Sequence, residues 1–394
     1  MRSVDEHRHV VAGLITPRPP VTVGVREALG LVLAQDVVAG IALPAFDNSA
    51  MDGYAVFADD VAAADPDHPV RLPVAEDIPA GRTDIPTITP GTAHRIMTGA
   101  PLPTGATAVV PVEKTDAGTD VVTIQASARA GQHIRRAGED VTPGTTVLPA
   151  GQVLTPAALG LVAALGFSAV DVIPRLRVLV VSTGTELVAA GTPLQPGQIY
   201  ESNGVMLAAA VRDAGAEVVA VPMTGDDVEV FRDAVRSAGP ADVILTTGGV
   251  SAGAYEVVKD AWSGQVEFVK VAMQPGMPQG AGVVDGTAVI TLPGNPVSAL
   301  VSFEVFVRPA LRAAMGLADT ERPRRTAILR EDLTSPAGKR QYRRGVLDGD
   351  SVTSYGPPAS HHLRWLASAN CLLELDENTT ELATGSQVRV WDLR

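Results

Sequence analysis

The segment RVLVVSTGTEL, residues 177–187, determines the fold that the sequence predicts. It begins as an uninterrupted apolar run, which is typical of a buried strand, and it ends in a Ser-Thr-Gly turn. A helical pattern follows over residues 202–215, and the next apolar run is AEVVAV, residues 216–221. Apolar strands that alternate with helices form a parallel sheet covered on both faces, so we predict a doubly wound α/β domain.

The same alternation continues toward residue 320. It predicts a helix over 228–239, strands over 241–247, 266–273 and 287–292, and a last helix that begins at Asn295-Pro296 and bends at Pro309. Right-handed crossovers place every strand-to-helix loop of such a sheet at one edge, where open α/β sheets bind ligands.

Four loops are expected at that edge: STGTEL (182–187), TGDD (224–227), TTGGVSAG (246–253) and LPGNPVSA (292–299). Their glycines let backbone N–H groups approach phosphate oxygens, and the helices that follow add partial positive charge. The alternative is that glycine and proline only make tight turns. We favour a site for a small phosphate-bearing ligand. The residues expected to bind this ligand include Ser182, Thr183, Gly184, Gly248, Gly249, Ser251, Gly294, Asn295 and Ser298.

Acidic side chains gather at the same edge, on Glu186, Asp226, Asp227 and Glu256. Carboxylates beside a phosphate site are explained by a divalent cation between them, because Mg²⁺ in proteins uses one or two carboxylates together with substrate phosphates. For Asp226 and Asp227 the alternative is helix N-capping.

The regions on either side predict further domains. Residues 1 to about 43 are predicted to be helical, on the periodicity of residues 24–39. Residues 56–131 alternate short apolar runs with turns, and TPAALGLVAALG (155–166) predicts a helix with Thr155 as its N-cap. After residue 320 the pattern predicts a small β-barrel or sandwich. The expected domains are a split N-terminal domain (1–43 and 132–175), an inserted β domain (44–131), the α/β domain (176–320) and a C-terminal β domain (321–394).

Composition and charge restrict the function. The chain has 394 residues and a net charge of −13, which argues against a nucleic-acid partner. Its single cysteine, Cys371, lies in the apolar run CLLEL, where a buried and inert thiol is expected. We see neither an apolar signal core nor an apolar stretch near the ~20 residues that span a bilayer, so we expect a cytoplasmic protein without a membrane partner. The adjacent His361 and His362 are expected to point apart in a loop.

Seven motifs together resemble the MoeA family, the molybdopterin molybdenumtransferases, which includes the E domain of gephyrin. They are FDNSAMDGYAV, RIMTGAPLPTGATAVV, IRRAGEDV, STGTEL, GQIYESN, TTGGVS and LPGNPVSALVSFE, in the family's order. The resemblance implies a split domain, an inserted β domain, a molybdopterin-binding α/β domain and a C-terminal β-barrel, working as a homodimer. It implies that molybdenum from molybdate is inserted into adenylylated molybdopterin, with release of AMP and a need for Mg²⁺.

The resemblance also assigns roles to residues of this chain. It implies catalytic roles for Asp52, Asp140, Glu186, Asp226, Glu256 and Lys270, with Glu186, Asp226 and Glu256 near the metal, and substrate contacts from Thr98, Pro293, Pro296, Arg344 and Ser360. Arg344 is expected to reach into the cleft from the C-terminal domain. Taken singly, Asp52, Thr98 and Asp140 are more often turn residues.

One loop departs from the family pattern. Where the family reads K-P-G-K-P, residues 274–278 read Gln-Pro-Gly-Met-Pro, so Gln274 and Met277 replace two lysines. A charge-assisted hydrogen bond to an anion contributes about 1.5–3 kcal/mol, so the change weakens anion binding. This leaves open a second function, that of a gephyrin-like scaffold that binds a partner peptide in the groove between the α/β and C-terminal domains, near Tyr355 and Ser360.

Overall fold

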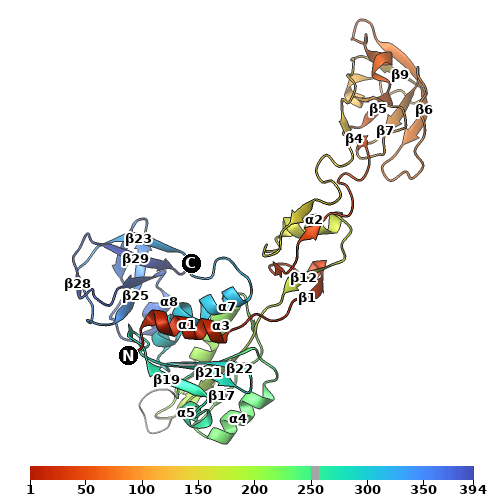
Figure 1. Ribbon diagram of the computed structural model, residues 1–394. Coiled ribbons are helices and arrows are strands. Elements are labelled where there is room, and N and C mark those ends of the chain that lie inside the picture. Colours follow the sequence, from red (N-terminus) through yellow and green to blue (C-terminus); the bar gives the residue numbers. More distant parts are fainter. Residues whose placement is uncertain (250–256) are drawn as a thin grey trace. The chain divides into compact units, whose positions relative to one another are not determined.

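The structure of the chain is a computed structural model that describes residues 1–249 and 257–394. The chain divides into a larger unit, residues 1–21 and 172–394, and a smaller unit, residues 22–171 (Figure 1). No helix among the described residues is long and apolar enough to cross a lipid bilayer.

A seven-stranded sheet forms the centre of the larger unit. Its order is β16-β13-β18-β22-β21-β19, and β17 also pairs with β13. The strands are β13 (Arg177–Thr183), β16 (Glu217–Val218), β17 (Met223–Thr224), β18 (Val243–Thr247), β19 (Val266–Lys270), β21 (Pro278–Val284) and β22 (Thr287–Leu292). The strands from β16 to β22 run parallel, so the carboxyl ends of β13, β17, β18 and β22 meet at one edge.

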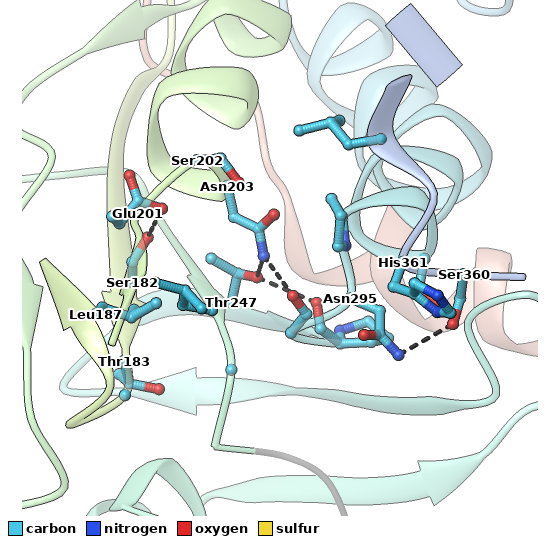
Figure 2. A pocket seen from close by; sticks show the side chains of 18 of the residues that line it. Ser182, Thr183, Leu187, Glu201, Ser202, Asn203, Thr247, Asn295, Ser360 and His361 are labelled. Carbon is cyan, nitrogen blue, oxygen red and sulfur yellow. Dashed lines mark hydrogen bonds between the residues drawn. The ribbon is translucent and has the colours of Figure 1, made fainter. Parts of the chain in front are cut away.

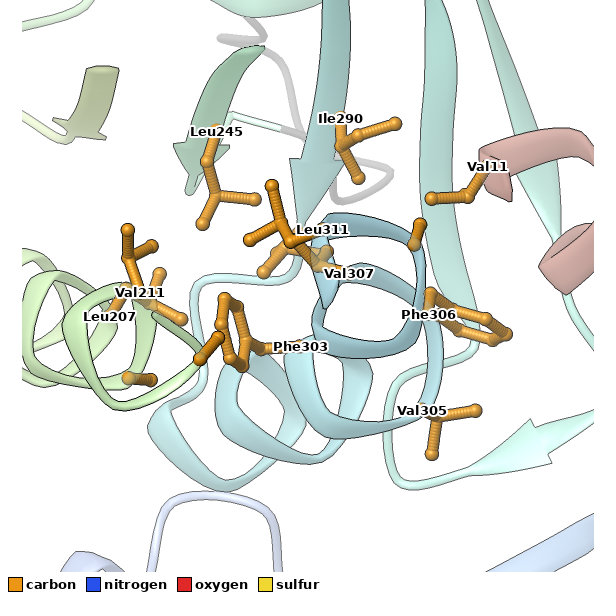
Figure 3. Close-up of a cluster of buried hydrophobic side chains, with 14 of the residues drawn as sticks. Val11, Leu207, Val211, Leu245, Ile290, Phe303, Val305, Phe306, Val307 and Leu311 are labelled. Carbon is orange, nitrogen blue, oxygen red and sulfur yellow. The ribbon is translucent and has the colours of Figure 1, made fainter. Parts of the chain in front are cut away.

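Helices cover both faces of this sheet, as the sequence predicts (Figure 1). They are α1 (Val4–Leu14), α3 (Asn203–Asp213), α4 (Val228–Ser237), α5 (Val257–Ala261), α6 (Pro296–Ser302) and α7 (Arg308–Ala314). On one face, Leu245 and Ile290 of the sheet pack with Leu207, Phe303 and Leu311 (Figure 3). On the other face, Phe231 of α4 and Val257 of α5 pack on Leu179 and Val289.

The helix that begins after Asn295 is irregular where the sequence predicted a bend. A π-helical turn, Phe303–Val307, separates α6 from α7 just before Pro309. Proline lacks the N–H that an α-helix requires and its ring crowds the preceding turn, which explains the interruption. Buried aromatic side chains of this turn, Phe303 and Phe306, fill the core beneath it.

The prediction that the whole sheet is parallel is wrong. β21 lies between β19 and β22 and is antiparallel to both. The sequence pattern does not predict β21, because Gly280 and Gly282 dilute its apolar residues. The Asp285-Gly286 pair, with φ of 49° and 80°, turns the chain from β21 into β22, and Asp-Gly is a strong hairpin signal.

The C-terminal part of the larger unit is a closed β-barrel, which confirms the predicted fold class. Its strands are β23 (Arg324–Leu329), β25 (Arg340–Asp348), β26 (Ser351–Ser354), β27 (Cys371–Leu375) and β29 (Gln387–Asp392). Pairing of β25 with β27 closes the sheet, and β20 (Met273–Gln274) adds to β25 from the α/β domain. Cys371 is buried in the barrel core, as expected, and burial raises the pKa of its thiol to about 12.

The smaller unit contains the predicted β module. Its five-stranded sheet has the order β8-β5-β7-β6-β9, made of β5 (Gly53–Val56), β6 (Val70–Ile78), β7 (Ala93–Ile96), β8 (Ala108–Pro111) and β9 (Val121–Ile124). Helix α2 (Pro156–Ala164) lies where the sequence predicts it, with Thr155 Oγ1 accepting a hydrogen bond from the Ala158 N–H at 3.2 Å. This N-cap satisfies one of the donors that the first helical turn leaves free.

The helix predicted over residues 1–43 is confirmed only for α1 (Val4–Leu14) and is absent over residues 24–39. The segment contains the end of β1 (Val21–Gly24), a 3₁₀ turn (Val25–Glu27), β2 (Val32–Leu33) and β3 (Val37–Val38). Gly30, at φ +74°, breaks any helix there, and its N–H donates to the Leu154 carbonyl. Pairing with distant segments overrides the local helical pattern over residues 24–39. The confirmed helix α1 is capped by Ser3 and Glu6.

Candidate functional site

The strand-end loops of the α/β domain line one pocket of about 930 Å³. Figure 2 shows Ser182 and Thr183 of β13 at one end, Asn203 and Thr247 between, and Asn295 at the other end. The loop 358–361 of the C-terminal domain adds a wall beyond Asn295. The prediction that these loops meet at one edge is confirmed for their described residues.

Glycine brings two of the loops into contact. Gly248 has φ +94°, and a Cβ there would lie 2.4 Å from the Thr183 carbonyl oxygen. Only glycine fits such a backbone conformation and such a close approach. The backbone after β18 therefore lies directly against the end of β13, with its polar groups beside the pocket.

A hydrogen-bond network fixes the loops relative to one another. Asn203 Nδ2 donates to Thr247 Oγ1 at 2.9 Å and to the Gly294 carbonyl at 2.7 Å, and Thr247 Oγ1 donates to the Pro293 carbonyl at 3.1 Å (Figure 2). The first residue of α3 is thereby bonded to the end of β18 and to the loop after β22. Thr183 Oγ1 is buried and finds no hydrogen-bond partner among the described residues.

The acidic side chains of the pocket differ in their partners. Glu201 Oε1 accepts from Ser182 Oγ at 2.9 Å and from the Gly204 N–H at 2.6 Å, so this carboxylate caps the start of α3. Asp226 Oδ2 accepts from Thr185 Oγ1 at 3.0 Å. The Glu186 carboxylate folds over Gly184 and has no hydrogen bond to a described residue.

Helix capping accounts for the neighbouring acidic residue. Asp227 Oδ1 accepts from the N–H groups of Glu229 and Val230 at 2.9 and 3.0 Å. This is the N-cap arrangement of α4, which satisfies donors that the first turn leaves free. The capping alternative therefore holds for Asp227, while Asp226 lines the pocket.

The wall from the C-terminal domain is fixed by Ser360 and Arg344. Ser360 Oγ accepts from Asn295 Nδ2 at 2.9 Å, and the Ser360 carbonyl accepts from the Val297 N–H at 3.0 Å. Arg344 is buried and donates to the carbonyls of Pro357 and, at 2.9 Å, His362. Burial lowers the pKa of Arg344. Arg344 thus supports the loop from behind and lines a smaller adjacent cavity.

Comparison with known proteins identifies the family. Three family models match: MoeA N-terminal region (domain I and II) over residues 2–166, probable molybdopterin binding domain over 179–313, and MoeA C-terminal region (domain IV) over 326–393. Molybdopterin molybdenumtransferase 2 of Mycobacterium tuberculosis is 65% identical over 404 residues, which cover 100% of both chains. The chain belongs to the MoeA family.

Other MoeA proteins are similar to this chain over nearly its whole length. Molybdopterin molybdenumtransferase 1 of M. tuberculosis is 40% identical and covers 99% of this chain and 98% of its own length. The enzyme of Haemophilus influenzae is 34% identical, with the same coverage. The crystal structure of a MoeA protein from Pyrococcus horikoshii superposes with a TM-score of 0.83 at 29% identity, covering 100% of this chain and 99% of the other. The MoeA relatives make this chain an enzyme of molybdenum cofactor biosynthesis.

The remaining residues expected at the site are spread over the chain. Gly249, Pro293, Pro296 and Ser298 also line the pocket, whereas Lys270 is exposed at the end of β19 and does not. Ser251 and Glu256 lie outside the described residues. Asp52, Thr98 and Asp140 belong to the smaller unit.

Two of the MoeA positions in the smaller unit contact each other. Asp52 Oδ1 accepts from the Thr98 N–H at 2.6 Å and from Thr98 Oγ1 at 2.8 Å. These two bonds hold the pKa of the exposed Asp52 carboxyl below its usual value. Asp52 is therefore kept as a carboxylate in a fixed orientation.

The pocket offers two of the three carboxylates expected to hold Mg²⁺. Glu186 and Asp226 both line it, and no group of three His, Cys, Asp or Glu side chains suited to a metal occurs within residues 1–249 and 257–394. Two carboxylates suffice for Mg²⁺ when substrate phosphates supply further oxygens. A Cβ at position 184 would lie 2.5 Å from Glu186 Oε2, so the space that Gly184 leaves is filled by this carboxylate.

Two residues of the pocket, Asn203 and His361, were not predicted to belong to the site. Asn203 lies in the quoted motif GQIYESN, but its bridging role depends on loops that only the fold brings together. His361 lines the pocket beside Ser360. The expectation that its side chain points away from that of His362 is wrong, because the centroids of the two rings are 4.3 Å apart. The signal available was the position of His361 next to Ser360 in the GPPASH segment.

Proposed function

We propose that this MoeA-family enzyme inserts molybdenum from molybdate into adenylylated molybdopterin and releases AMP. The observation that carries the proposal is the pocket at the carboxyl ends of β13, β18 and β22. It lies within the region that matches a probable molybdopterin binding domain, in a chain 65% identical to a protein named molybdopterin molybdenumtransferase 2. Open α/β sheets bind phosphate-bearing ligands at this edge.

The residues of the pocket can bind and orient such a ligand. Gly248 and Gly294 expose backbone beside the pocket, which suits close approach of phosphate oxygens. The Asn203 network keeps the loops in one arrangement, so little ordering is needed when the ligand binds. Thr183 Oγ1, buried without a partner among the described residues, supplies an unused polar group at the end of β13.

Glu186 and Asp226 are the described residues that would hold Mg²⁺. Bound Mg²⁺ would offset phosphate charge and polarise a phosphoryl oxygen. Thr185 Oγ1 orients the Asp226 carboxylate, and Gly184 leaves room for that of Glu186. Without a cation, these carboxylates would repel an anionic ligand.

Measurement of AMP release tests the proposal. Purified protein with adenylylated molybdopterin, molybdate and Mg²⁺ should release AMP in a molybdate-dependent reaction. Asp226→Asn should raise the Mg²⁺ concentration needed for half-maximal rate, whereas Asp233→Asn, on the exposed side of α4, should not. No AMP release by the unchanged protein at any Mg²⁺ concentration would reject the proposal.

We also propose that the chain forms a homodimer, as the family resemblance implies. Light scattering of the purified protein across a range of concentrations measures its mass directly. A mass that stays at 40.7 kDa, the mass of one chain, would reject this part of the proposal.

A gephyrin-like scaffold is the second candidate. The observation that favours it is the uncharged Gln274, whose Oε1 accepts from Gln341 Nε2 of the barrel at 3.4 Å. This polar contact joins the two domains at a position where Gln274 also lines the pocket. The scaffold candidate predicts a specific partner peptide whose binding is weakened by Tyr355→Ala, and binding unaffected by that substitution would count against it.

A further inference from the structure

The charge of the pocket is unusual for a site that binds an anion. Three carboxylates, on Glu186, Glu201 and Asp226, line it, and its described lining contains neither lysine nor arginine. The sequence of residues 250–256, VSAGAYE, has no basic side chain either. His361 is the only lining residue of the described chain whose side chain can become positively charged.

The position of His361 separates it from two of the carboxylates. His361 follows Ser360, which is bonded to Asn295 after β22 (Figure 2). Glu186 follows β13, and β18 lies between β13 and β22. Two strand spacings correspond to about 10 Å. The pocket thus has an acidic end, suited to a cation, and a separate end where the imidazole lies.

The loop that carries His361 is held in place. Ser360 is bonded through its hydroxyl to Asn295 and through its carbonyl to Val297. On the barrel side, Arg344 of β25 donates to the carbonyl of His362. The charged or titratable groups that face His361 are the ring of His362 on its own loop, the Arg344 guanidinium behind that loop and the carboxylates across the pocket. The His361 side chain is exposed and therefore accessible to a ligand in the pocket.

We propose that the imidazolium form of His361 is the cationic contact for an oxyanion of the ligand, a phosphate group or molybdate. The proposal rests on the function proposed above for the identity of the ligand. Histidine acquires its positive charge as pH falls through the neutral range, so ligand binding strengthens from pH 8 to pH 6. A charge-assisted hydrogen bond to an anion changes affinity by about tenfold or more.

Calorimetric binding to the full-length protein at pH 6, 7 and 8 tests this assignment, with molybdate and AMP as separate probes. We expect the affinity for at least one probe to rise about tenfold from pH 8 to pH 6. His361→Gln should remove this rise, and His361→Arg should give strong binding at both pH values. His362→Gln is the matched control, because its ring does not line the pocket, and it should keep the rise. Circular dichroism checks that each variant is folded.

The two probes identify which oxyanion contacts His361. A rise in affinity for AMP alone identifies a phosphate group, and a rise in affinity for molybdate alone identifies molybdate. Affinity that does not change with pH, or that changes equally in His361→Gln, would overturn the assignment. AMP release by the same preparations separates this inference from the proposed function. A pH-dependent contact without molybdate-dependent AMP release rejects the transferase function alone, and turnover with a pH profile unchanged in His361→Gln rejects the role of His361 alone.

Discussion

Asn295 Nδ2 donates a hydrogen bond to Ser360 Oγ at 2.9 Å, and this bond joins the α/β domain to the C-terminal domain at the pocket. Asn295 occupies the N-cap position of α6 without making a side-chain capping bond. A polar side chain at the N-cap position usually accepts a hydrogen bond from a backbone N–H of the first helical turn. Here the side chain instead holds the wall of the pocket that carries Ser360 and His361.

Loss of the Asn295–Ser360 bond should weaken ligand binding more than stability. We expect Asn295→Ala and Ser360→Ala each to raise KM severalfold, because the loop with His361 is then ordered only on binding. In a double-mutant cycle the two substitutions should couple by about 0.5–1.5 kcal/mol in ligand binding. Ser368→Ala, which removes an exposed hydroxyl just after helix α8 (Leu363–Ala367), is the control. Strict additivity would contradict a role of this bond in the site.

Arg344 should act through the loop behind the pocket rather than through direct contact with the ligand. Arg344→Lys retains the charge but cannot span the carbonyls of Pro357 and His362 in the same way. We expect the free energy of unfolding to fall by about 1–3 kcal/mol and KM to rise. The control is Arg325→Lys on the exposed side of the barrel. Unchanged stability with a large loss of kcat would indicate direct contact with the reacting groups instead.

Gly184→Ala should affect the dependence on Mg²⁺. A Cβ at this position would lie 2.5 Å from Glu186 Oε2 and must displace the carboxylate. We expect the Mg²⁺ concentration for half-maximal AMP release to rise about tenfold, which corresponds to ~1.4 kcal/mol. Gly197→Ala controls for backbone strain, because Gly197 has φ +84° and no atom lies within 4 Å of a Cβ added there. Equal effects of the two substitutions would exclude a specific role of Glu186.

The sequence predicted the parts of the site that depend on local pattern. The strand-end loops were recognisable because apolar runs stop at Gly-rich turns, and parallel strands bring such turns to one edge. The hairpin of β21 and β22 was overlooked because alternation weakens where glycines replace apolar residues. The segment after Gly24 was assigned to a helix because its apolar spacing fits one, while its pairing partners, such as Val153, are far away in the sequence.

Residue roles within the pocket were less predictable than the fold. Arg344 and His361 lie close in sequence, and resemblance assigned the ligand to Arg344. In the structure the Arg344 guanidinium is buried behind the loop, while His361 lines the pocket. Which member of such a pair reaches a ligand depends on packing between domains, which one-dimensional patterns do not contain.

Thr98 should control the protonation of Asp52. Its N–H and hydroxyl both donate to Asp52 Oδ1 and hold the pKa of this carboxyl below its usual value of 3.8. Thr98→Val removes the hydroxyl bond and keeps the backbone bond, so the pKa of Asp52 should rise toward 3.8. Thr98→Ser should restore the lowered pKa. Carbon-13 NMR of the Asp52 carboxyl against pH measures it, and a pKa unchanged in Thr98→Val would show that the hydroxyl contributes nothing.

His7 should make the larger unit less stable in acid. Its ring is buried, with its centroid 4.7 Å from that of the Phe306 ring. Neither ring nitrogen has a hydrogen-bond partner among the described residues. Burial, together with the charge of Arg2, lowers the pKa of His7 from 6.5 to about 4. The unfolded chain therefore takes up a proton between pH 6.5 and 4 that the folded chain excludes. The stabilising contribution is complete above pH 6.5 and decreases as pH falls toward 4.

Urea unfolding of His7→Leu measures this contribution. Between pH 6.5 and 4.5, the difference in unfolding free energy between the unchanged protein and His7→Leu should shift by up to about 1.4 kcal/mol per pH unit, in favour of the variant in acid. Leucine fills the space beside Phe306 without a titratable group, so its own stability should lack this dependence. His9→Leu, at an exposed position of the same helix, is the control. If the free energies of unfolding of the unchanged protein and of His7→Leu depend on pH in the same way, the prediction is wrong. His7 would then carry the same protonation in the folded and unfolded chains.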